Sequence, residues 1–134
     1  MKKILISLIV LSVIGVGIGY YMYNKPVESL EYKKADVVIS ADQLIKEYES
    51  DETAANEKYL GKVIEVSGKV ADITEEGGKK KVSMETSNPM SAVICEMEEK
   101  MSTGDMKAGD NVKMKGMCSG YLSDVILVQS NVVK

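Results

Sequence analysis

The stretch KYLGKVIEVSGKVADI, residues 58–73, predicts one long β-strand that is interrupted by a glycine. Ile64, Val66 and Val70 recur at even spacing, which places them on one face of a strand, and Gly68 falls in phase between the last two. A glycine weakens a regular strand because it packs no side chain and loses more backbone entropy on folding. Gly68 therefore indicates a structural bend, typical of a small closed barrel in which the first strand pairs with two neighbours.

Four further segments alternate apolar and polar residues, as strands do. They are separated by the turn residues EEGG and NPM and by an irregular connection, and they cover residues 80–86, 92–97, 111–118 and 125–133. Together with the first strand they make five. Five strands in so short a domain predict an all-β fold, the five-stranded Greek-key barrel called the OB-fold, preceded by a helical segment.

A helix is predicted directly before the barrel. Ser40 followed three residues later by Gln43 is a capping box, so the helix should begin at Ala41. Asp51 can cap a second helix, and the pattern leaves open whether the segment forms one helix or two in series, ending at Gly61.

The beginning of the chain is too apolar to belong to a globular domain. After Lys2 and Lys3, the run from Ile4 to Tyr23 carries no charge and is long enough to span about 30 Å of bilayer hydrocarbon. It can remain as a membrane anchor or be cleaved as a secretory signal. In both cases the lysines stay in the cytoplasm, which predicts an exported domain on the periplasmic or extracellular side of the cell membrane. No cysteine follows the run, so a lipoprotein anchor is excluded.

The composition changes again after the apolar run, where NKPVESLEYKKADVV is polar and contains a proline. Such a segment is typical of a spacer between an anchor and a domain. The sequence therefore predicts three parts: a signal anchor or transmembrane helix over 1–23, a polar linker over 24–39, and the OB-fold domain with its helix over 40–134.

The composition of the exported part argues against several classes of function. The chain has 17 basic residues, all of them lysine, and without Lys2 and Lys3 the remaining 15 face 20 acidic residues, a balance of −5. An acidic domain without arginine repels phosphate backbones and lacks the usual bidentate reader of phosphate. Histidine, the commonest general base and metal ligand, is absent. Since no nucleophile motif or metal-spaced cluster is present either, we expect no enzyme activity, cofactor or metal site.

Two blocks, residues 40–73 and 106–130, resemble the tRNA-anticodon-like OB-fold family, tRNA_anti-like. The matching motifs fall on Ser40, Ala41, Leu44, Tyr48, Asp51, Glu52, Ala55, Tyr59, Gly61, Lys62, Gly109, Asp110, Val112, Lys115, Gly116, Cys118 and Gly120. The resemblance implies an OB-fold that follows a bacterial signal or membrane anchor. The family name reflects a likeness of fold to nucleic-acid binders, which assigns no site.

OB-folds bind ligands on their second and third strands and on the adjoining loops. The candidate ligand-binding residues there are Lys79, Lys80, Lys81, Ser83, Glu85 and Tyr121. Nucleic-acid-binding OB-folds need stacking aromatics in a cationic groove, and the outward strand positions here offer no aromatic residue. We therefore expect a membrane-tethered, non-catalytic binding module for a protein or envelope-glycan partner. The alternative is single-stranded nucleic acid, bound through Lys79–Lys81 and Tyr121.

Cys95 and Cys118 are the two cysteines, and strand parity points both into the barrel. In an exported domain they are predicted to form a disulfide, with two buried thiols or a redox or metal role as alternatives. The chain also has nine methionines but no phenylalanine or tryptophan. We expect the methionines of the domain to fill the core rather than to bind Cu(I). They are Met84, Met90, Met97, Met101, Met106, Met114 and Met117.

Overall fold

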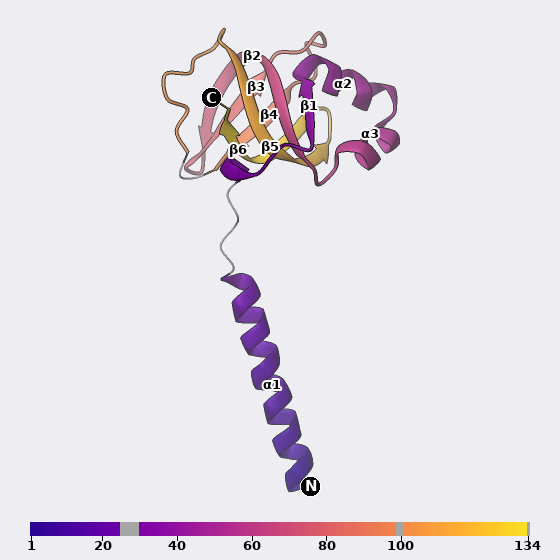
Figure 1. Cartoon of the computed structure of the whole chain (residues 1–134), viewed down its shortest axis with the longest axis vertical. Helices are drawn as coiled ribbons and strands as arrows, with labels where there is room; N and C mark the ends of the chain where they lie inside the picture. The colour runs from indigo at the N-terminus through magenta and orange to yellow at the C-terminus, as the bar shows by residue number, and fades with distance from the viewer. Residues whose placement is uncertain (25–29, 99–100, 134) are drawn as a thin grey trace.

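The computed structural model describes residues 1–24, 30–98 and 101–133 (Figure 1). Ahead of the barrel lie α1 (Lys2–Tyr23), the 3₁₀ helix η1 (Leu30–Tyr32), β1 (Val37–Ser40), α2 (Ala41–Ser50) and α3 (Glu52–Tyr59). The barrel strands are β2 (Val63–Glu76), β3 (Lys79–Met84), β4 (Val93–Met97), β5 (Asn111–Tyr121) and β6 (Val125–Val132). Of the predicted linker, residues 25–29 lie outside the described residues.

The barrel closes because β2 pairs with two different strands. Residues 63–69 of β2 lie antiparallel to β5, and residues 70–76 lie antiparallel to β3. β3 pairs with β4, β4 lies parallel to β6, and β6 pairs with β5, which leads back to β2. The predicted five-stranded OB-fold barrel is therefore confirmed.

Gly68 lies just before the point where β2 changes partners. It still faces β5, and two residues later Val70 faces Met84 of β3, with a bulge between Val70 and Asp72. A Cβ on Gly68 would lie 3.1 Å from the Cβ of Ala41 and 3.2 Å from the Sδ of Met84. The missing side chain thus lets the start of α2 and the end of β3 pack directly against β2.

Gly116 of β5 marks a second close approach between elements. A Cβ at this position would overlap the Oγ of Ser130 and lie 3.0 Å from the Cβ of Leu127 and 3.1 Å from the carbonyl oxygen of Val128. These atoms belong to β6, the neighbouring strand, whose backbone is held in the sheet. Even if the Ser130 hydroxyl rotated away, a side chain at Gly116 would still press on the Leu127 Cβ and the Val128 carbonyl oxygen, which move only with the β6 backbone.

The helical segment forms two helices in series, and the sequence signals place both starts correctly. The side chain of Ser40 accepts a hydrogen bond from the Gln43 N–H at 3.2 Å, and Asp51 Oδ1 accepts one from the Ala54 N–H at 3.1 Å. α3 ends at Tyr59, slightly before the predicted end. α2 buries an apolar face on the barrel, made of Ala41, Leu44, Ile45 and Tyr48.

The sheet has one strand more than predicted, and this strand lies inside the segment assigned to the linker. β1 runs parallel to β2, with Val37 opposite Ile64. Asp36 holds this segment against the start of β2 through two hydrogen bonds. Its N–H donates to the carbonyl of Val63 at 2.8 Å, and its Oδ2 accepts from the Val63 N–H at 3.0 Å. Leu30 of η1 is only 3% exposed, and η1 contacts β5 and β6. The packed part of the described chain therefore extends back to Leu30. The sequence did not reveal this, because a strand of four residues is too short to show a clear periodicity.

α1 differs from every element of the barrel domain because none of its residues is buried. Its 22 residues are long and apolar enough to cross a membrane. A secretory signal near the N-terminus has the same length and composition, so both predicted fates of this helix are compatible with the structure.

The two cysteines lie in the core as free thiols, not as the predicted disulfide. Cys95 of β4 and Cys118 of β5 both face Leu127 of β6, which lies between them. A disulfide joins residues whose Cα atoms are up to about 7 Å apart. Because Leu127 occupies the position between them, the two cysteines are not cross-strand neighbours. The intervening strand thus keeps the two sulfur atoms separate.

Substitution at either close-packed glycine should destabilise the barrel. We expect Gly116→Ala and Gly68→Val each to lower the free energy of unfolding by about 1–3 kcal/mol, because each inserts atoms into filled space. Urea unfolding of the full chain in detergent micelles measures this. Thr74→Val, at an exposed position of the same β2 strand, is the control and should change stability by less than about 0.5 kcal/mol. Full stability of Gly68→Val would contradict the steric role of Gly68.

Thiol titration should distinguish free cysteines from a disulfide. The unreduced chain should show two reactive thiols when denatured, because Cys95 and Cys118 are both free. Both should be unreactive in the native protein, since they are 0% and 2% exposed and burial raises the pKa of the Cys95 thiol to about 12. If the denatured, unreduced protein showed no reactive thiols, the predicted disulfide would be supported instead.

Candidate ligand-binding surfaces

The predicted ligand face lies on the outer side of β3 and β4. Register places Lys81 of β3 between Thr74 of β2 and Glu96 of β4. The Nζ of Lys81 lies 3.0 Å from an Oε of Glu76 and 3.7 Å from an Oε of Glu96. Glu76 in particular raises the pKa of Lys81. The cation at the centre of this face is therefore held by two carboxylates.

The other predicted residues on β3 are placed among charges of both signs. Lys79 and Lys80 face Glu76 and Glu75 across the β2–β3 hairpin. Ser83, on the outer side of β3, faces Asp72 on one side and Ile94 on the other. Glu85 follows β3 and forms an ion pair with Lys69 at 3.6 Å. The basic run that stands out in the sequence is thus a mixed-charge surface in the fold.

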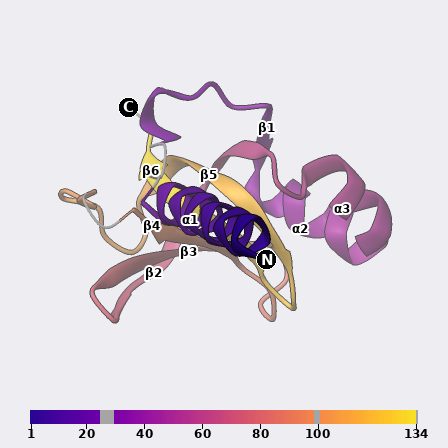
Figure 2. The same cartoon turned by 90° about the horizontal axis from the view of Figure 1, so that it is seen from below.

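Tyr121 is not part of this surface. Its ring stacks on the ring of Tyr48 of α2, with centroids 5.2 Å apart. Tyr121 is the last residue of β5, and this end of β5 lies beside the start of β2, where Met117 faces Val63. Lys79 faces Glu76, at the other end of β2. Figure 2 shows the β2–β3 hairpin and the α2–α3 helices on opposite sides of the barrel. The fold therefore separates Tyr121 from the lysine run.

Several residues of the family motifs hold the helices on the barrel. The Tyr48 hydroxyl lies 3.4 Å from the Sγ of Cys118, and burial, assisted by Cys118, raises the pKa of Tyr48. The N–H of Gly61 donates to the carbonyl of Cys118, and the N–H of Cys118 donates to the carbonyl of Lys62. These motif residues therefore form the packing contacts between α2, α3 and β5, and they do not line a pocket.

A polar cluster joins α2 to α3 beside this joint. Glu47 Oε2 accepts hydrogen bonds from the Tyr59 hydroxyl at 2.6 Å and from the Lys58 Nζ at 2.8 Å. Lys58, followed by Tyr59, lowers the pKa of Glu47, and the Lys58 ammonium also lies 5.0 Å from the Tyr59 ring centroid. The cluster borders a hollow of about 310 Å³. Sequence reasoning missed it, because its members come from two helices whose packing is not visible in the periodicity.

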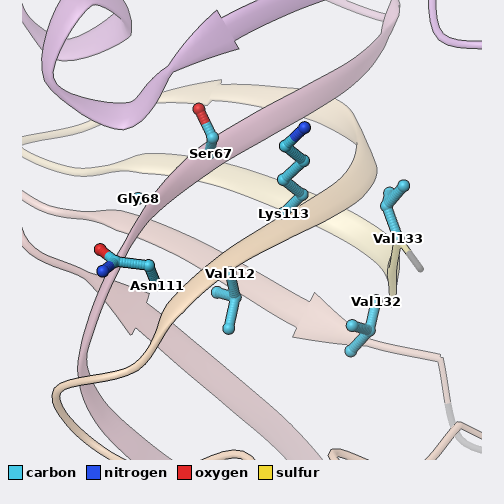
Figure 3. Close-up of a pocket in the computed structure, with 7 residues that line it drawn as sticks. All are labelled: Ser67, Gly68, Asn111, Val112, Lys113, Val132 and Val133. Atoms are coloured by element: carbon cyan, nitrogen blue, oxygen red, sulfur yellow. The ribbon is translucent and has the colours of Figure 1, made fainter.

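A second hollow is a groove on the β2–β5–β6 side of the barrel, with a volume of about 560 Å³ (Figure 3). Ser67 faces Lys113 across the β2–β5 pair, and Gly68 faces Val112. Its lining consists of Ser67, Gly68, Asn111, Val112, Lys113, Val132 and Val133. None of these residues except Gly68 was a site candidate in the sequence. Strand parity marks Lys113 as outward, but only the pairing of β2 with β5 brings it to Ser67.

Comparison with known proteins identifies the family. The sequence matches the tRNA_anti-like family over residues 1–132. This chain belongs to the tRNA_anti-like family. The match extends over the whole barrel, so the predicted resemblance is confirmed. A comparison with curated protein sequences finds no significant match.

Solved structures share the fold of this tRNA_anti-like chain. One is described as a "putative nucleic acid-binding lipoprotein from Klebsiella pneumoniae subsp. pneumoniae MGH 78578"; it is 18% identical, with a TM-score of 0.61, over 72% of this chain and 91% of that one. Another, a "putative aspartyl-tRNA synthetase from Leishmania major Friedlin", is 12% identical with a TM-score of 0.46, over 89% of this chain and 25% of that one. The first supports the fold, and the second is too distant to support an argument.

The Glu47 cluster should make stability depend on pH in the acidic range. The pKa of Glu47 lies below its ordinary value of 4.5 in the folded state. The interaction therefore stabilises the protein above the unfolded pKa and is lost as the pH falls through the folded pKa. We expect Glu47→Gln to be less stable than the wild type near pH 7, with a difference that shrinks below about pH 4.

Thermal unfolding of the full chain in detergent micelles at several pH values measures this difference. Glu57→Gln, which removes one charge from an exposed position of α3, is the matched control and should not reproduce the pH dependence. A constant difference between Glu47→Gln and the wild type from pH 7 to 3 would contradict the assigned role of Glu47.

Proposed function

We propose that this tRNA_anti-like chain is a membrane-tethered, extracytoplasmic binding module without catalytic activity, whose partner is a protein or an envelope glycan. The N-terminal helix supports the tether, since it is long and apolar enough to span a bilayer. Lys2 and Lys3 at its start favour a cytoplasmic N-terminus and an exported domain. Five residues separate Asn24 from the packed domain at Leu30, so an uncleaved anchor keeps the barrel within about 20 Å of the membrane surface.

The single observation that carries the choice of partner is the charge arrangement on the β3–β4 face. Lys81 lies between Glu76 and Glu96, and the outward positions of these two described strands hold no aromatic residue. Single-stranded nucleic acids are bound by stacking aromatics in cationic grooves. The β3–β4 face instead presents paired charges, hydroxyls and an aliphatic side chain. Such a face matches a polar protein surface or a glycan better than a nucleic acid.

A binding role without catalysis agrees with the family, whose OB-fold domains are generally binding modules. Within residues 1–24, 30–98 and 101–133, no three acidic or cysteine side chains cluster as metal ligands would. The most perturbed carboxylates, Asp42 and Glu47, have lowered pKa values because of adjacent lysines and hydrogen bonds. Carboxylates tuned in this direction suit structural ion pairs better than a general base near neutral pH.

Nucleic-acid binding is the second candidate function. It is favoured by the run Lys79–Lys81 and by the description of the Klebsiella structure as a putative nucleic acid-binding lipoprotein. Against it, the fold places Tyr121 with the helices and provides carboxylates beside the lysines.

Two measurements on the same face separate the candidates. In intact cells, a photo-reactive residue in place of Ser83 should form a crosslinked adduct with the partner. Nuclease should leave this adduct unchanged, and protease or glycan hydrolases should shorten the crosslinked partner. The same residue in place of Glu57, which is exposed on α3, should form none. Adduct formation at both positions, or an adduct removed by nuclease, would contradict the proposed function.

Titration of the full chain in detergent micelles with a labelled single-stranded oligonucleotide at low salt should show no saturable binding. Saturable binding that is lost when Lys79, Lys80 and Lys81 are all replaced by Gln would establish the second candidate instead.

A further inference from the structure

The groove lined by Ser67, Asn111 and Lys113 combines hydrogen-bonding groups with a cation. Ser67 and Lys113 are cross-strand neighbours, and Figure 3 shows their side chains rising on the same side of the β2–β5 pair. Because side chains alternate along a strand, Asn111 belongs to the same face of β5 as Lys113. Two strands, β2 and β5, thus contribute a hydroxyl, an amide and an ammonium group to the lining of one hollow of about 560 Å³.

The charges around the groove leave the Lys113 ammonium unneutralised. Among the described residues, Lys113 has no ion-pair partner. Lys69, which lies on the same face of β2 as Ser67, differs because it pairs with Glu85 at 3.6 Å. Asp110, the nearest acid in sequence, is turned toward the N–H of Lys107, which donates to its Oδ2 at 3.1 Å. Among the described lining residues Lys113 is the one that carries a charge, on a protein that is acidic overall.

The remaining lining is small and aliphatic. Gly68 contributes no side chain, and Val112 and Val132 turn toward the core, against which they pack. Val133 forms the wall beside Lys113 (Figure 3). A hollow of this volume is within the range of small-ligand sites, in which a few polar groups fix the orientation of the ligand.

We propose that this groove binds the carboxylate of a hydroxylated ligand, specifically a sugar acid. Lys113 Nζ donates a charge-assisted hydrogen bond to the carboxylate, and the Ser67 hydroxyl and the Asn111 amide bind the sugar hydroxyls. One ammonium without a guanidinium matches a singly charged carboxylate better than a doubly charged phosphate, which is commonly bound through bidentate arginine contacts. The site is distinct from the β3–β4 face and goes beyond the function proposed for it.

Saturation-transfer NMR of the full chain in detergent micelles, with D-galacturonate as the probe, tests this assignment. The wild type should bind D-galacturonate saturably, and D-galactose, which lacks the carboxylate, about tenfold more weakly or not detectably. Lys113→Gln should weaken D-galacturonate binding by about tenfold or more, and Ser67→Ala and Asn111→Ala should each weaken it by a smaller factor. Circular dichroism of each variant verifies that the barrel is intact.

Lys46→Gln is the matched control, because it removes the same charge from an exposed position of α2 that does not line the groove. It should retain wild-type binding of D-galacturonate. Equal binding of D-galactose and D-galacturonate, tighter binding of inorganic phosphate, or unchanged binding in a folded Lys113→Gln variant would each overturn the proposal. Because the groove variants leave the β3–β4 face intact, failure here is distinguishable from failure of the Ser83 crosslinking experiment.

Discussion

The structure depends on one constraint: strand β2 must hydrogen-bond to β5 along its first half and to β3 along its second half. A strand that pairs with two neighbours in this way has to coil sharply. Where β2 passes from β5 to β3, the elements packed on it approach its backbone closely. Gly68 meets both needs, because its missing side chain leaves room for Ala41 of α2 and Met84 of β3. Closure of the barrel, the position of α2 and the groove beside Gly68 all follow from this exchange of partners.

The residues that identify the family act mainly on architecture. Tyr48 and Cys118 meet at the interface of α2 and β5, Gly61 turns the chain from α3 toward β2, and Gly116 lets β5 and β6 approach. The family match therefore establishes the scaffold, and it assigns no ligand.

The two candidate surfaces show how neighbours decide what a lysine can do. Lys81 stands in the most basic run of the sequence, yet Glu76 and Glu96 hold its ammonium group. Lys113 stands alone in the sequence, yet it borders a hollow of about 560 Å³ and has no ion-pair partner among the described residues. An isolated cation in a hollow can recruit an anionic group, whereas an ammonium already bonded to two carboxylates has little to offer one.

Local chemistry was sufficient to predict much of this protein. Alternating strands, the caps at Ser40 and Asp51 and the uncharged run of α1 depend on residues close together in the chain, so the sequence by itself determined the OB-fold, both helix starts and the membrane-spanning candidate. Tertiary structure alone decided which distant residues became neighbours. It placed Leu127 between the two cysteines, Tyr121 on Tyr48, and β1 against β2. These outcomes depend on strand pairing across the closed barrel, and no pattern within a single strand records which strand will lie beside it.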